Sequence, residues 1–173
     1  MVFCGSSHGN DPLYEKSTRE LATQLAYAKM DLIYGGGSIG LMGVLADQML
    51  AHGRKVTGII PKMIYDWEVG HKGITKLEIV EDMHERKARM AALGDAFIAL
   101  PGGIGTLEEI IEAFTWLQLG YHSKPCMFYN VRGYYDYLLL MMDHMTKEGF
   151  LKKSQRDSLI ISDDPKIILD ILT

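Results

Sequence analysis

The chain has 173 residues, of which 47% are hydrophobic and 23% are charged, a balance ordinary for a soluble globular protein. This length is sufficient to bury one sizeable core, so we expect a single domain over residues 1–173. The net charge of −4 gives no reason to expect nucleic acid or a membrane surface as a partner.

The two cysteines, Cys4 and Cys126, lie far apart and fit no metal-ligand spacing. We therefore expect reduced thiols, no metal site and a cytoplasmic location. The sequence starts directly with an apolar run and contains no stretch near 18 apolar residues, so we expect neither export nor membrane insertion.

Short apolar runs alternate with helical patterns along the whole chain, which is the signature of parallel strands joined by helical crossovers. The pattern predicts an α/β fold: one Rossmann-like domain with a parallel sheet of about six or seven strands and helices on both faces. The expected strands are Val2–Cys4, Leu32–Tyr34, Lys55–Ile60, Leu77–Val80, Ala96–Leu100, Cys126–Tyr129 and a short one at Leu159–Ile161. The expected helices are Pro12–Lys29, Leu41–His52, Met83–Leu93, Leu107–Leu119, Tyr134–Lys147 and Pro165–Leu172.

Two loops near the start of the chain are candidates for ligand contact. The first strand leads into Ser6 and Ser7 at the carboxyl edge, where open α/β sheets bind ligands, although a simple polar turn explains them better in isolation. The second strand leads into a glycine loop in which Gly36 and Gly37 could let a nucleotide or sugar approach the backbone. Tight turning and helix packing are the alternative explanation for these glycines.

The glycine loop has the G-x-G-x-x-G spacing, in Gly35, Gly37 and Gly40, but lacks a second requirement of dinucleotide sites. Such sites need an acidic residue about 20 positions later, at the end of the next strand, and that strand ends in Ile60-Pro61. An NAD-dependent oxidoreductase is therefore disfavoured.

Residues 61–73 break the alternating pattern and read as a long loop of aromatic and charged residues, of the kind that often binds ligands. Glu68 in this loop is a candidate ligand contact, with a solvated carboxylate as the alternative. Further on, Asp82 is a good N-cap for the helix that carries Arg86. Arg86 falls at the carboxyl edge of the sheet, where a guanidinium can hold a phosphate or carboxylate, although a solvated cationic face is the usual explanation.

The sequence from Pro101 to Glu109, PGGIGTLEE, joins a buried strand to an apolar helix. Glycines at such a junction turn backbone N–H groups toward a ligand, and the following helix N-terminus favours an anion. Thr106 is a plausible N-cap, which would place Glu109 at the third helical position of a capping box. Glu109 therefore either caps a helix or takes part in chemistry. The order of glycines and the missing lysine exclude a P-loop.

Two motifs stand in order, Met83-His84-x-Arg86-Lys87-x-x-Met90 and Pro101-Gly102-Gly103-x-Gly105-Thr106-x-x-Glu109. Together they resemble the LOG family, the cytokinin riboside 5′-monophosphate phosphoribohydrolases, whose members have often been labelled "possible lysine decarboxylase". The resemblance runs through nearly the whole chain and no motif position departs from it. A lone lysine is more often a surface charge than a Schiff-base residue, so the residues give no support to a decarboxylase.

The resemblance implies hydrolysis of the N-glycosidic bond of AMP or an N6-modified AMP, without cofactor or metal, by a homodimer. It implies Arg86 and Glu109 as the catalytic pair. The substrate-binding positions that it implies are Glu68, Arg86, Lys87, Gly103, Ile104, Gly105, Thr106, Leu107, Glu108, Glu109 and Thr115. Further contacts that we consider from their place on the same edge are Ser6, Ser7, Gly36, Gly37 and Met83.

The residue types suit this chemistry. Cleavage passes through an oxocarbenium-like state, so a carboxylate can stabilise the charged sugar and orient water, by analogy with glycoside hydrolysis. Glu109 is the first choice for this carboxylate and Glu108 the alternate. Two glutamates at the start of a helix would repel a phosphate, so Arg86 or Lys87 must supply nearby positive charge. Thr115 has a simpler explanation, a small core hydroxyl bonded to its own backbone.

A different class of protein is also compatible with this sequence. A binding module on the same scaffold, such as a nucleotide sensor or a cofactor carrier resembling the molybdenum cofactor carriers, would need the loops but not both Arg86 and Glu109. The presence of both residues favours the enzyme.

Overall fold

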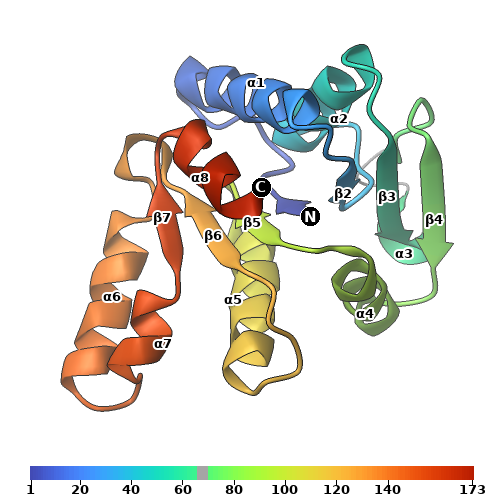
Figure 1. The fold of residues 1–173 in the computed structure, drawn as a ribbon. Coiled ribbons are helices and arrows are strands. Elements are labelled where there is room, and N and C mark those ends of the chain that lie inside the picture. The colour runs from blue at the N-terminus through green and yellow to red at the C-terminus, as the bar shows by residue number, and fades with distance from the viewer. Residues whose placement is uncertain (66–69) are drawn as a thin grey trace.

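The computed structural model describes residues 1–65 and 70–173, and it confirms the predicted α/β architecture of parallel strands flanked by helices (Figure 1). The strands are β1 (Val2–Phe3), β2 (Leu32–Tyr34), β3 (Val56–Pro61), β4 (Lys76–Val80), β5 (Phe97–Ala99), β6 (Cys126–Tyr129) and β7 (Ile160–Ser162). The helices are α1 (Pro12–Tyr27), α2 (Gly40–Ala51), α3 (Lys62–Tyr65), α4 (Met83–Leu93), α5 (Ile104–Gln118), α6 (Asp136–Lys147), α7 (Lys153–Asp157) and α8 (Pro165–Leu172), with a 3₁₀ turn at Val131–Gly133.

The strands form two parallel sheets rather than one continuous sheet. One has the order β1-β5-β6-β7 and the other the order β2-β3-β4. The chain therefore runs from β1 toward β4 on one side and returns to β5 on the other side of β1. In open α/β folds such a reversal of strand order marks the place where ligands bind, beyond the carboxyl ends of the strands.

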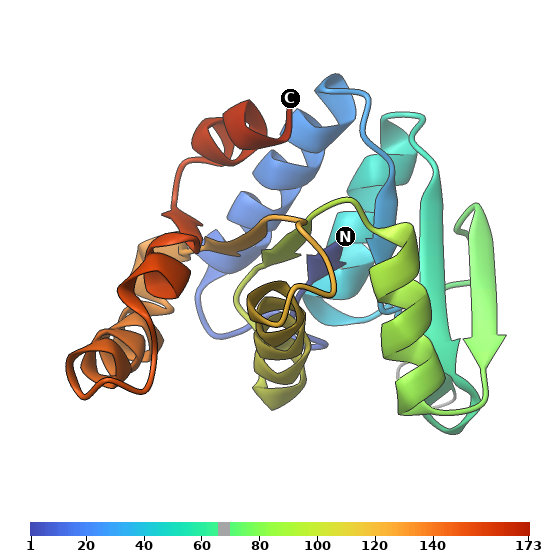
Figure 2. The ribbon, with the colours of Figure 1, turned by 60° about the horizontal axis from the view of Figure 1, so that its bottom comes forward.

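Helices cover both faces of the strands, and each face has its own hydrophobic core. Figure 1 shows α1, α2 and α8 on one side and α4, α5 and α6 on the other, and Figure 2 shows the second group from a different direction. Side chains alternate along a strand, so neighbours divide between the cores: Ile98 packs with the first group of helices, and Phe97 and Ala99 pack with the second. This division accounts for the near-continuous apolar runs in the sequence.

Aspartate side chains cap the starts of α1 and α4, and the cap by Asp82 confirms the prediction made for that residue. The Asp11 carboxylate accepts a hydrogen bond from the Leu13 N–H at 2.8 Å, and the Asp82 carboxylate accepts one from the Glu85 N–H at 2.8 Å. The second cap fixes the start of α4 and therefore the position of Arg86 in its second turn. Across residues 1–65 and 70–173, no helix is both long and apolar enough to span a lipid bilayer.

Candidate active site

A cavity of about 340 Å³ lies beyond the carboxyl ends of β1, β2 and β5, where the order of the strands reverses. Loops after these strands and the first turns of α4 and α5 form its wall. Its lining residues are Val2, Phe3, Cys4, Gly5, Ser6, Gly35, Met42, Ile64, Met83, Arg86, Gly103, Ile104, Gly105, Thr106, Glu108 and Glu109.

Helix α5 opens onto this cavity with an uncapped N-terminus. Its N-cap is Gly103, which offers no side chain to the first N–H groups, and the first turn contains no acidic residue. The first helical residues, Ile104 and Gly105, are exposed, so the helix end presents backbone donors to the cavity. Such an end favours an anion through its N–H groups and the helix dipole.

The expectation that Thr106 is the N-cap and Glu109 the third residue of a capping box is wrong. Helix α5 starts at Ile104, so Thr106 occupies the third helical position and Glu109 lies in the second turn. Glu109 is therefore too far into the helix to bond the free N–H groups at its start. The same shift moves Glu108 and Glu109 away from the anion-binding end, which weakens the repulsion expected from them.

Arg86 and Glu109 form an ion pair at the edge of this cavity. Nη2 of Arg86 lies 3.4 Å from Oε1 of Glu109, and the two side chains are only 6% and 11% exposed. Nη2 also donates a long hydrogen bond to the Gly35 carbonyl at 3.5 Å. The buried Nε of Arg86 meets no hydrogen-bond partner among the described residues, so this guanidinium has an unused donor.

Gly35 allows the guanidinium to lie against the backbone. A Cβ atom at this position would lie 2.3 Å from Nη2 of Arg86 and 3.3 Å from Sδ of Met42. The first glycine of the predicted glycine loop therefore makes room for an arginine, which is a different role from the dinucleotide contact that its spacing resembles.

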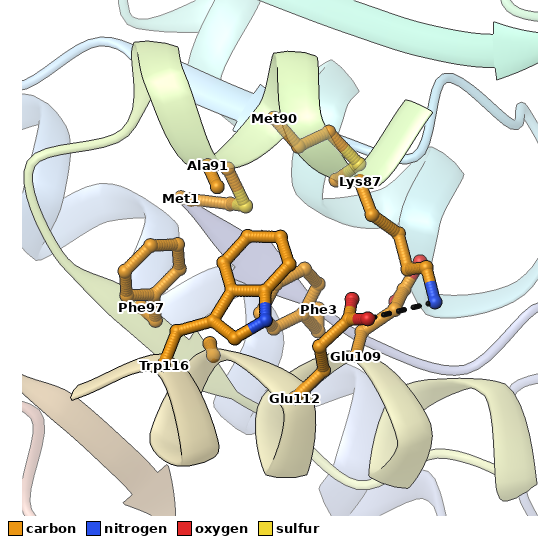
Figure 3. Close-up of a pocket in the computed structure, with 10 residues that line it drawn as sticks. Met1, Phe3, Lys87, Met90, Ala91, Phe97, Glu109, Glu112 and Trp116 are labelled. Carbon is orange, nitrogen blue, oxygen red and sulfur yellow. Dashed lines mark ion pairs between the residues drawn. The ribbon is translucent and has the colours of Figure 1, made fainter. Parts of the chain in front are cut away.

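Lys87 lies beside this pair but points into a second, much narrower pocket of about 10 Å³. Its Nζ is 2.6 Å from Oε1 of Glu108 and 3.1 Å from Oε1 of Glu112, on successive turns of α5. The hydrogen bond that Lys87 donates to Glu108 is the main cause of the raised pKa of Lys87. Figure 3 shows Lys87 and Glu112 on one side of this pocket and Trp116 on the other. The lysine thus ties α4 to α5, which holds Arg86 and Glu109 together.

The two adjacent glutamates have different surroundings. Glu108 is 46% exposed and pairs with Lys87, whereas Glu109 is 11% exposed and pairs with Arg86. Both line the larger cavity. Of the two glutamates, Glu109 is therefore the one that is largely buried together with Arg86.

The predicted site residues divide into those that the structure gathers at the cavity and those that it places elsewhere. The residues gathered there are Ser6, Met83, Arg86, Gly103, Ile104, Gly105, Thr106, Glu108 and Glu109. Ser7 lines a separate pocket of about 180 Å³, whose wall includes Pro101, Gly102 and Gly103. The predicted residues Gly36, Gly37, Lys87, Leu107 and Thr115 lie outside the lining of the larger cavity, and Glu68 lies outside the described residues.

Local packing explains several of these positions. Gly36 has φ +85° and lies against Leu77 and Ile60, so it serves the turn and the packing. Leu107 is partly buried and packs from α5 against the hydrophobic core. The hydroxyl of Thr115 donates to the Ile111 carbonyl at 2.8 Å, which confirms the predicted bond to its own helix, but its position is exposed and not in the core.

Sequence reasoning missed seven residues of the cavity wall, namely Val2, Phe3, Cys4, Gly5, Gly35, Met42 and Ile64. Gly35 could have been found as the first glycine after β2. Nothing in the sequence indicated that Met42 and Ile64 line a site, because an apolar residue near a helix start usually belongs to the hydrophobic core. Ile64 belongs to the short helix α3, in a segment that was expected to be a loop.

Two chemical features bear on cofactors. Among the described residues no group of three or more His, Cys, Asp or Glu side chains is placed to hold a metal ion. Cys4 and Cys126 are both buried thiols, and burial raises the pKa of Cys126 to about 12, so that thiol is unreactive at neutral pH.

The fold and this site define an α/β protein in which an ion pair adjoins a helix N-terminus whose backbone N–H groups suit an anion. Comparison with known proteins then identifies the family. The family described as "possible lysine decarboxylase" matches residues 42–172. Two curated relatives are a probable cytokinin riboside 5′-monophosphate phosphoribohydrolase of Oryza sativa subsp. japonica and a cytokinin riboside 5′-monophosphate phosphoribohydrolase of Arabidopsis thaliana. They are 46% identical over 99% of this chain and 70% of the relative, and 47% identical over 95% and 78%, respectively. The chain belongs to this LOG family of phosphoribohydrolases.

Solved structures with the same fold include more distant proteins. The molybdenum cofactor binding protein of Rippkaea orientalis aligns with a TM-score of 0.72 at 16% identity, covering 99% of this chain and 93% of that one. The molybdenum cofactor carrier protein of Chlamydomonas reinhardtii aligns with a TM-score of 0.70 at 16% identity, covering 99% and 92%. At this identity the likeness concerns the fold alone.

Proposed function

We propose that this protein hydrolyses the N-glycosidic bond of AMP or of N6-modified, cytokinin-type riboside 5′-monophosphates, releasing the free base and ribose 5-phosphate. The observation that carries the proposal is the buried Arg86–Glu109 pair, which lines the same cavity as the uncapped N-terminus of α5. One feature suits the phosphate and the other suits the sugar, as a nucleoside monophosphate requires. Relatives 46–47% identical to this chain have names that specify this activity.

In the proposed reaction the 5′-phosphate binds at the α5 N-terminus, through the N–H groups of Gly105 and Thr106. This places the ribose near Glu109, whose carboxylate stabilises the positive charge that develops at C1′ and orients a water molecule. The bond between C1′ and the base nitrogen breaks, the water oxygen bonds to C1′, and a proton from the water ends on the released base. Arg86 fixes the carboxylate of Glu109 in place.

Incubation of the purified protein with AMP tests this proposal directly. We expect adenine and ribose 5-phosphate in equal amounts, and little release from adenosine, because adenosine lacks the phosphate. A panel of AMP, N6-isopentenyl-AMP, GMP and CMP would establish the preferred base. Tight binding of AMP without release of adenine would instead indicate a carrier or sensor.

A homodimer is part of the proposal and has support in an exposed apolar stripe on α6. Tyr137, Leu140 and Met141 are 86%, 61% and 50% exposed, and their spacing places them on one side of the helix. Apolar side chains gathered in this way commonly mark an interface between subunits. A cytoplasmic location is likewise proposed, since buried reduced thiols suit a reducing compartment.

Leu140→Glu is expected to convert the dimer to a monomer, because a carboxylate in the middle of an apolar interface must be buried without a counter-charge. Light scattering coupled to size-exclusion chromatography measures the mass of both proteins. Lys147→Glu, at the end of the same helix, is a control that also introduces a carboxylate and should leave the mass unchanged. A wild-type protein that elutes as a monomer would contradict the dimer.

A further inference from the structure

The turn between β5 and α5 is held by hydrogen bonds to three consecutive carbonyl groups. The donors come from two distant parts of the chain, the loop after β1 and the start of α6. The Leu100 carbonyl accepts from the Tyr135 hydroxyl at 2.5 Å, the Pro101 carbonyl from the Gly5 N–H at 3.1 Å, and the Gly102 carbonyl from the Tyr134 hydroxyl at 2.6 Å.

The bond from Tyr134 determines which way the next N–H group points. A trans peptide is planar, so the carbonyl of Gly102 and the N–H of Gly103 point in opposite directions. Tyr134 lies with Gly102 and Gly103 in the smaller pocket of about 180 Å³, and Gly103 also lines the larger cavity. With its carbonyl bonded on the Tyr134 side, this peptide directs the Gly103 N–H toward the cavity at the start of α5.

This peptide needs a constraint because it joins two glycines. Neither residue has a Cβ atom to hinder rotation, so the Gly102–Gly103 peptide can flip more readily than a peptide between other residues. A Cβ atom at Gly103 would meet nothing within 4 Å, so packing around Gly103 does not fix the peptide either. The Tyr134 hydroxyl supplies a specific bond that favours one orientation.

The chain after β6 is shaped to bring Tyr134 to this place. Arg132 and Gly133 both have left-handed backbone conformations, with φ 55° and 69°, which turn the chain back toward the β5–α5 turn. The Asn130 side chain accepts a hydrogen bond from the Tyr135 N–H at 2.7 Å and fixes the start of α6. A left-handed backbone conformation is unfavourable for arginine, and here it brings the following residues into contact with the β5–α5 turn.

Tyr134 is not explained by burial in the core. Its side chain is 42% exposed, whereas its neighbour Tyr135 is 2% exposed and packs against Phe128 with ring centroids 4.8 Å apart. The ring of Tyr134 contacts Tyr14 edge to face, with centroids 5.8 Å apart, and this contact aims its hydroxyl at Gly102.

We propose that Tyr134 is a positioning residue for phosphate recognition: its hydroxyl holds the Gly102–Gly103 peptide so that the Gly103 N–H donates to the phosphate of the substrate. The inference rests on the proposed function for the identity of that anion as a nucleotide 5′-phosphate. It assigns Tyr134 no contact with the reacting atoms.

Tyr134→Phe removes only the hydroxyl and tests the proposal. We expect the Kd for ribose 5-phosphate, measured by calorimetry, to rise about 5- to 10-fold, the usual scale for one lost hydrogen bond between neutral groups. The KM for AMP should rise by a similar factor while kcat changes by less than about twofold. Binding of adenosine, which has no phosphate, should be unchanged. Tyr121→Phe, beyond the end of α5 and 78% exposed, is the matched control.

The outcomes separate this inference from the proposed function. If the wild type binds ribose 5-phosphate and Tyr134→Phe binds it equally well, the inference is wrong whether or not AMP is hydrolysed. A purely structural role would lower the melting temperature and weaken ribose 5-phosphate and adenosine alike, which would also overturn it. A wild type that binds no ribose 5-phosphate would contradict it as well. Failure to release adenine, with the phosphate effect present, would overturn only the proposed function.

Discussion

Glu109→Gln is expected to lower kcat for AMP hydrolysis by roughly 10²- to 10⁴-fold, the range typical for removal of a catalytic carboxylate. Glutamine keeps the shape and a hydrogen-bond acceptor for Arg86 but removes the negative charge that stabilises the sugar. Some loss of stability is also expected, because the buried Arg86 loses this counter-charge. Initial rates should therefore be measured well below the unfolding transition, with circular dichroism to verify the fold.

Two neighbouring glutamates provide the controls for this variant. Glu112→Gln removes a charge one turn further along α5, on a residue that pairs with Lys87 and does not line the larger cavity. Glu108→Gln removes the more exposed carboxylate of the adjacent pair. Both are expected to retain activity within about tenfold of wild type. A larger loss for Glu108→Gln than for Glu109→Gln would show that Glu108 is the carboxylate facing the sugar.

Gly35→Ala is expected to lower kcat/KM for AMP by roughly 10- to 100-fold, although it changes no ionisable group. The added Cβ would lie 2.3 Å from Nη2 of Arg86, so the guanidinium must move, and a displacement near 1 Å can cost about 100-fold in rate. The atom displaced is the end of a flexible side chain and Gly35 has no positive φ, so the melting temperature should change little.

A double-mutant cycle with Arg86→Ala identifies the cause of that loss. If Gly35→Ala acts by moving the guanidinium, then adding it to Arg86→Ala should lower kcat/KM no further. Additive losses would contradict this explanation and would indicate an independent effect on the loop after β2. Steady-state kinetics of the four proteins with AMP is the required measurement.

Most of the fold could be predicted because the two sides of each strand pack into separate cores. Continuous apolar runs such as Phe97–Ala99 and Cys126–Tyr129 pack against a layer of helices on each side of the sheet. Few other folds place both sides of a strand in a core, so such runs indicate this fold. The short helices α3 and α7 were missed, since four or five residues carry too little periodicity. The division of the strands into two sheets, between β1 and β2, was also not predicted, because the sequence of one strand does not show which other strand it bonds to.

The candidate site could be predicted in part, and the errors have definite physical causes. Thr106 was predicted to cap α5 because threonine favours that position, whereas Gly103 was predicted only as a binding residue, because a glycine N-cap has no side chain that marks it. The closeness of Arg86 and Glu109 was expected from the shared edge of the sheet, and the structure has the two groups 3.4 Å apart. The contact between Gly35 and Arg86 was beyond sequence reasoning, since it depends on how α4 packs against the loop after β2. The role of Tyr134 was also beyond sequence reasoning, because its hydroxyl bonds to a residue 32 positions earlier in the chain.

The three bonds to the β5–α5 turn also have a consequence for the order of folding. Their donors, Gly5, Tyr134 and Tyr135, lie 96, 32 and 35 residues from their acceptors along the chain (101 − 5, 134 − 102 and 135 − 100). Contacts of such separation form late, because closing long loops costs entropy before any bond is gained. During synthesis, a chain that has reached α5 has made the glycines of the turn but not the tyrosines that fix their peptides. The full affinity for a phosphate should therefore arise only after the chain beyond β6 has emerged and docked.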